Sequence, residues 1–201
     1  KWARENGCSW NEETCEKAAF GGNLELLKWA RKNGCPWNEQ TCTSAANNNH
    51  IKVLKWAREK GCPWNAETCE MAAFSGHLEL LKWARKNGCL WGAGVCTQAA
   101  EGGHFGVLKW ARKKSCPWDS TLPETAAASG DLEILKWARE QGCPWEHTAA
   151  TVAARRGKVE IVQWMIEEDC PVYLPDLLEA AAIHPKLLYC LKEKGLLECA
   201  N

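Results

Sequence analysis

Apolar and polar positions follow two helical registers that alternate along the chain, with one pair of registers in every 27 residues. In the first register, Cys15, Ala18 and Ala19 stand at i, i+3 and i+4, which is the spacing of one helix face. Asn11 precedes them and suits a helix N-cap, because its short side chain can accept from the free N–H groups of the first turn. We predict a short helix whose small apolar face lets a neighbouring helix come close.

The second register predicts another short helix. Its apolar set consists of Leu24, Leu26, Leu27 and Ala30. Gly34 follows, where glycine can adopt the left-handed conformation that ends a helix, and Pro36 blocks any continuation. One such pair of helices could not bury its apolar faces alone, whereas stacked pairs share a continuous core.

Tryptophan and cysteine, with 13 residues each, repeat on the same period. Such a bias makes internal repeats the first question to ask of the chain. All tryptophans stand in two series with steps of 27: Trp2, Trp29, Trp56, Trp83, Trp110, Trp137 and Trp164, and Trp10, Trp37, Trp64, Trp91, Trp118 and Trp145. Cysteine forms a long series and a shorter one: Cys8, Cys35, Cys62, Cys89, Cys116, Cys143 and Cys170, and Cys15, Cys42, Cys69 and Cys96.

The period predicts an all-α helix–turn–helix solenoid of about seven 27-residue repeats, which form a single repeat domain over residues 1–201. At its end, Val172 replaces the loop tryptophan and Cys190 takes the helix tryptophan position, as is typical of terminal repeats. Because the chain begins inside a second helix, we expect a monomeric fragment of a longer chain. The predicted parts are a partial repeat 1–10, the repeats 11–37, 38–64, 65–91, 92–118, 119–145 and 146–172, and a C-terminal capping repeat 173–201.

The repeat resembles the ankyrin repeat. The stretch 77–82 (HLELLK) is similar to the second ankyrin helix, and Gly-Cys-Pro-Trp-Asn stands where that family has Gly-Ala-Asp-Val-Asn. An ankyrin repeat has about 33 residues, and the missing residues fall where its β-hairpin projects. The resemblance therefore implies an ankyrin-like stack with little or no β-hairpin. It also implies a protein-interaction scaffold that binds through the concave face of the first helices.

The tryptophan and cysteine series admit structural and functional interpretations. Regular tryptophans favour core packing, with an exposed aromatic ladder that stacks bases or sugars as the alternative. The cysteines favour reduced, buried thiols. At least one disulfide remains an alternative, and a metal site is disfavoured because Cys8 and Cys15 are seven residues apart, which is no zinc-knuckle spacing.

Variable positions carry the information about a partner, because residues that are constant in every repeat serve the repeat itself. A column is here the set of residues that hold the same position in successive repeats. Three columns of the first helix vary, those that begin at Glu16, Lys17 and Phe20, and their spacing of i, i+1 and i+4 places them on one helix face. We expect the apolar Phe20, Met71 and Phe74 there to be exposed and covered by a partner protein. The predicted partner-binding residues are Glu16, Lys17, Phe20, Ser44, Asn47, Glu70, Met71, Phe74, Gln98, Glu101, Thr125 and Arg155.

Charge supplies the alternative function. The formal net charge is zero, yet the second helices carry a stripe of lysine and arginine such as Lys82 and Arg85. This stripe could bind a polyanion or nucleic acid. The sequence contains no phosphate-binding loop, nucleophile motif or metalloprotease motif, so we expect no enzyme activity, no cofactor and no metal. It contains no long apolar run and no signal peptide, so we expect no membrane contact and a cytoplasmic location.

Overall fold

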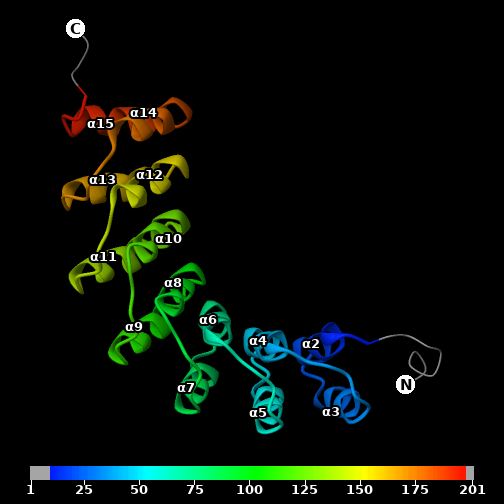
Figure 1. The fold of residues 1–201 in the computed structure, drawn as a ribbon. Coiled ribbons are helices and arrows are strands. Elements are labelled where there is room, and N and C mark those ends of the chain that lie inside the picture. The colour runs from blue at the N-terminus through cyan, green and yellow to red at the C-terminus, as the bar shows by residue number, and fades with distance from the viewer. Residues whose placement is uncertain (1–9, 198–201) are drawn as a thin grey trace. The chain divides into compact units, whose positions relative to one another are not determined.

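The computed structural model describes residues 10–197, and these form fourteen helices and no strand (Figure 1). The helices alternate between a first and a second helix of each repeat, so the all-α repeat fold is confirmed. The first helices are α2 Glu12–Phe20, α4 Glu39–Asn47, α6 Ala66–Phe74, α8 Gly94–Glu101, α10 Thr121–Ser129, α12 His147–Arg155 and α14 Leu174–Ile183. The second helices are α3 Leu24–Lys32, α5 Ile51–Glu59, α7 Leu78–Lys86, α9 Phe105–Lys113, α11 Leu132–Glu140, α13 Val159–Glu167 and α15 Pro185–Glu193.

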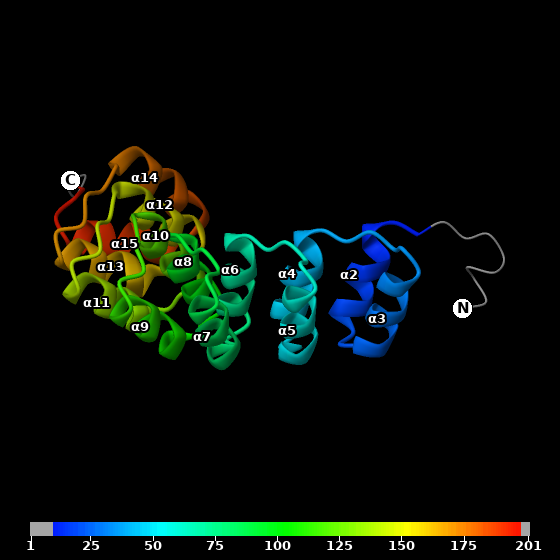
Figure 2. The ribbon, with the colours of Figure 1, turned by 60° about the horizontal axis from the view of Figure 1, so that its bottom comes forward.

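The chain divides into two compact units, Lys1–Pro117 and Trp118–Asn201, called here the N-terminal and C-terminal units. The division falls in the loop between two repeats. In the N-terminal unit, α2, α4 and α6 form one row and α3, α5 and α7 form the other (Figures 1 and 2). The single domain predicted over residues 1–201 stays a prediction.

The first helices of successive repeats pack directly on one another: α2 on α4, α4 on α6, and α6 on α8. Their facing side chains are small and fully buried, as Cys42, Ala45 and Ala46 show in α4. At Gly102 the backbones come so close that any Cβ would collide with the carbonyl oxygen of Phe74. The small apolar face predicted from the sequence therefore sets the spacing of this layer.

Histidines tie several repeats to the preceding one. His50 Nε2 lies 2.9 Å from the carbonyl oxygen of Phe20, and its ring fills the space beside Gly22, which has φ +67°. His77 Nε2 makes the equivalent contact with the carbonyl oxygen of Asn47, at 3.1 Å. These contacts satisfy carbonyl groups that a helix C-terminus leaves without an internal partner.

Tight turns end the second helices as the sequence predicts. Gly34, Gly61 and Gly88 have φ between 81° and 86°, the left-handed conformation that glycine adopts without strain. Ser115 and Asp169 hold the same place in their repeats at φ 58° and 57°. The loops that follow carry no strand in the described part of the chain, so the absence of a β-hairpin is confirmed there.

The predicted C-terminal capping repeat contains α14 and α15. It exposes Leu178, Ile183, Leu188 and Tyr189, whereas a capping repeat usually has a polar outer face. Its role as a cap stays a prediction.

Candidate binding faces

The first-helix face of the N-terminal unit, formed by the outer side chains of α2, α4, α6 and α8, brings one predicted column together. Phe20, Asn47, Phe74 and Glu101 occupy the last helical position of the four neighbouring helices. Phe20 is 57% exposed and Phe74 is 39% exposed. Exposed phenylalanines therefore stand two repeats apart along this edge, as the sequence predicted.

The other two predicted columns lie nearer the seam between helices. Ser44 is only 9% exposed, and Met71 is half-buried, so the prediction of an exposed Met71 is wrong. The Glu70 carboxylate packs against Gly94 of the next first helix, and a Cβ added at Gly94 would collide with that carboxylate. Burial raises the pKa of the Glu70 carboxyl, and the negative charge of the neighbouring Glu67 raises it further. Much of this surface thus forms the contact between neighbouring first helices. The variation of a column along the sequence does not show how close its residues lie to that contact.

The remaining predicted residues differ in surroundings. Lys17 is exposed and pairs with Glu13 at 3.2 Å. Arg155 is exposed in the C-terminal unit, where it lies 3.4 Å from Glu179 and 3.8 Å from Asp176. The members of the set that are half-buried are Glu16, Asn47, Glu70, Met71, Gln98 and Thr125.

The second-helix face, formed by the outer side chains of the second helices and the loops after them, carries paired indoles. Trp37 in the loop after α3 meets Trp56 of α5 edge to face, with ring centroids 5.8 Å apart. The same pair recurs in the C-terminal unit as Trp145 and Trp164 at 5.7 Å. These rings are half-buried rather than core. The prediction of core tryptophans is therefore met only in part, because the indoles occupy the space between second helices that do not pack directly.

Arginines cover the loop indoles. The guanidinium carbon of Arg58 lies 4.2 Å from the ring centroid of Trp64, a cation–π contact. Arg85 repeats it over Trp91 at 4.4 Å, and its Nη1 also donates to the carbonyl oxygen of Cys89 at 2.8 Å. The arginines of the stripe are thus engaged in the fold.

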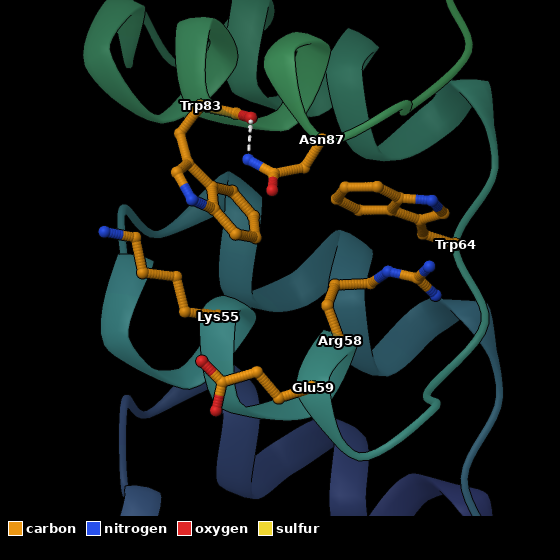
Figure 3. Close-up of a pocket in the computed structure, with 6 residues that line it drawn as sticks. All are labelled: Lys55, Arg58, Glu59, Trp64, Trp83 and Asn87. Atoms are coloured by element: carbon orange, nitrogen blue, oxygen red, sulfur yellow. Dashed lines mark hydrogen bonds between the residues drawn. The ribbon is translucent and has the colours of Figure 1, made fainter.

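Pockets open between successive second helices. One, of about 500 Å³, lies between α5 and α7, and its lining residues are Lys55, Arg58, Glu59, Trp64, Trp83 and Asn87 (Figure 3). In Figure 3, Lys55 and Arg58 extend from α5 toward the two indoles, and the Asn87 amide donates to the Trp83 carbonyl oxygen at 2.8 Å. A second pocket of about 300 Å³ has the lining 27 residues further on: Lys82, Arg85, Lys86, Trp91, Trp110 and Lys114.

The helices of the N-terminal unit separate charge between the two faces. Each of its second helices carries three lysines or arginines and at most one glutamate. Its first helices carry between one and three glutamates, and only α2 has a lysine. Zero net charge therefore conceals two oppositely charged layers.

The cysteines lie in pairs of neighbouring thiols, which the sequence analysis did not predict. Within the described residues, all cysteines are buried and free. The Cys42 thiol hydrogen-bonds to that of Cys62, twenty residues on, and Cys62 Sγ also lies 3.4 Å from the Asn38 carbonyl oxygen. Burial, and next the bond to Cys35, raise the pKa of Cys15 to about 12. The reduced, buried interpretation agrees with this arrangement.

Among residues 10–197, no three His, Cys, Asp or Glu side chains gather as metal ligands would.

Comparisons with known proteins identify the fold. No family model matches the chain, and no curated protein matches it. Among solved structures, the crystal structure of the human ASB11 ankyrin repeat domain superposes with a TM-score of 0.61 at 18% identity, and the match covers 78% of this chain and 83% of that one. The fold is therefore that of an ankyrin-repeat solenoid. None of the helices described is long and apolar enough to cross a bilayer.

Proposed function

We propose that the chain is a non-catalytic scaffold that holds another protein on the first-helix face of its N-terminal unit. The observation that carries the proposal is the exposure of Phe20 and Phe74 in one column of the repeat. The column holds Asn47 between them and Glu101 beyond them. Such an edge offers two apolar contacts flanked by polar ones, which is the composition of an interface core and its rim.

The histidines support a non-catalytic function. A catalytic imidazole needs a free nitrogen toward a substrate. In His50 and His184, Nε2 instead contacts a backbone carbonyl oxygen of the preceding repeat, at 2.9 and 3.2 Å, and the Nδ1 side of each ring packs against Gly22 or Gly157. These side chains serve the junctions between repeats.

The double variant Phe20→Ser/Phe74→Ser tests the proposal. Immobilised native chain and variant are each incubated with lysate from the source cells, and captured proteins are quantified by mass spectrometry. We expect at least one protein to be depleted tenfold or more on the variant, with an unchanged far-UV circular dichroism spectrum.

Leu26→Ser is the matched control, because Leu26 is 40% exposed, as Phe74 is, but belongs to the second helix α3. It should leave capture unchanged. Equal capture by the native chain and the double variant would remove the first-helix face as the binding site.

A further inference from the structure

One pocket of the second-helix face, between α7 and α9, contains cations that the fold itself does not use. The arginines stack on indoles and bond to backbone carbonyls. Lys82 pairs with Glu79 at 2.6 Å. By contrast, the ion pairs found among the described residues include neither Lys86 nor Lys114, and both line the pocket between α7 and α9. No carboxylate is among the residues that line this pocket.

Aromatic surface accompanies these cations. Trp91 and Trp110 are half-buried, and their ring centroids lie 5.7 Å apart. Both rings line the same pocket as Lys86 and Lys114. The pocket between α5 and α7 has the same indole pair and Lys55, whose Nζ lies 5.7 Å from the Trp83 ring centroid, but it has Glu59 and Asn87 at the positions of Lys86 and Lys114. Successive pockets follow successive helix pairs, so their spacing is on the order of 10 Å. The face therefore presents a row of sites that each combine positive charge with partly exposed indole.

The C-terminal unit shows which part of this arrangement belongs to the fold. Trp145 and Trp164 pair there at the same separation, with Arg139 over Trp145 at 4.5 Å. The second helix α13, however, carries no lysine or arginine and has Glu160 and Glu167. An indole pair with an arginine over its loop indole thus occurs in both units, whereas the repeat positions of Lys86 and Lys114 hold the glutamates Glu140 and Glu168 in the C-terminal unit. An anionic ligand of the N-terminal unit explains that difference.

We propose that the tandem pockets on the second-helix face of the N-terminal unit bind single-stranded nucleic acid. A single strand supplies a phosphate for the lysines and an unpaired base for the indoles, which is the combination that non-specific single-strand binding surfaces recognise. An acidic polypeptide would supply charge without a planar group. A duplex keeps its bases stacked inside, out of reach of indoles that lie between helices. This site is independent of the first-helix face and stands or falls separately from it.

Titration of the full chain with a fluorescent twelve-residue oligothymidylate tests the proposal, by anisotropy and by tryptophan emission at several salt concentrations. We expect binding at low salt with quenched tryptophan emission. In Lys86→Gln/Lys114→Gln, the slope of log affinity against log salt should become shallower by about 1.4, or about 0.7 for each lost phosphate contact.

Lys136→Gln is the matched control, since Lys136 has the repeat position of Lys55 and Lys82 but lies in the C-terminal unit. It should leave the affinity unchanged. Polyglutamate and a twelve-base-pair duplex serve as competing ligands. No binding at low salt, an unchanged slope in the double variant, or equal affinity for polyglutamate or the duplex would each overturn the proposal, and the last result would identify a purely electrostatic surface.

Discussion

The second-helix faces of the two units have the same aromatic packing and different charge. In the N-terminal unit, α7 carries three cationic residues and α9 carries three with no acid. In the C-terminal unit, α11 balances two cationic residues with two glutamates, and the charged residues of α13 are all glutamates. The indole pairs lie 5.7 to 5.9 Å apart in both units, apart from the first pair. The difference teaches that a repeat can keep its packing residues constant while its surface charge varies.

The largest effect should come from removing an indole, and it should be equal in the two units. Trp83→Ala and Trp164→Ala each remove a half-buried ring from the space between second helices. We expect each to lower the free energy of unfolding by about 2–3 kcal/mol, somewhat less than for a fully buried tryptophan. Urea denaturation measures this. A large loss for Trp164→Ala with none for Trp83→Ala would break the comparison, because the N-terminal indole would then serve a ligand alone.

Buried thiols should make both units less stable at alkaline pH. Burial raises the pKa of Cys170 to about 11 from its ordinary 9.0, and that of Cys15 to about 12. Above pH 9 the unfolded thiol loses its proton while the folded thiol keeps it, so the unfolded state binds fewer protons. Each thiol then lowers the free energy of unfolding by about 1.4 kcal/mol per pH unit, until the pH reaches its folded pKa.

Denaturation curves between pH 8 and 11 measure this slope. Cys170→Ala removes the contribution of the C-terminal unit, and Cys15→Ala removes one from the N-terminal unit. Each variant should show a shallower loss of stability than the native chain. Parallel curves for all three proteins would show that these thiols do not carry the dependence.

Lysines introduced into the C-terminal unit at the positions of Lys86 and Lys114 should give that unit the ability to bind oligothymidylate. Glu140 and Glu168 hold the repeat positions of Lys86 and Lys114. In the Lys86→Gln/Lys114→Gln background, Glu140→Lys/Glu168→Lys should restore oligothymidylate binding and steepen the salt dependence by about 1.4. Glu133→Lys/Glu160→Lys adds the same charge elsewhere on α11 and α13 and is the control. Equal restoration by both pairs would mean that net charge, rather than position beside the indoles, governs binding.

The smallest effect concerns two strained turns, one in each unit. Ser115 and Asp169 have positive φ where other repeats have glycine. The left-handed conformation is costly for residues with a Cβ, although glycine also raises the entropy of the unfolded chain. Ser115→Gly and Asp169→Gly should each raise the free energy of unfolding by about 0.5 kcal/mol, as measured by thermal denaturation. A loss of stability in either variant would show that its side chain makes a compensating contact.

Sequence alone determined the 27-residue period, the two helices of each repeat and the turns between them. These features depend on local chemistry: apolar spacing along one helix, a capping residue such as Asn38, and a glycine such as Gly61 at positive φ. It also identified the column of Phe20 and Phe74 as exposed. Local features of this kind repeat with the chain, so the period reveals them directly.

Tertiary structure decided which residues meet between helices and repeats. Cys42 pairs with Cys62, and Trp37 pairs with Trp56 across a repeat boundary. The stack also placed Ser44 in the seam, although its sequence column matches the exposed Lys17. Only the stacking of first helices through alanine, with second helices held apart by indoles, sets these distances. That spacing is what leaves half-exposed tryptophans beside unpaired lysines, and the period by itself contains no information about it.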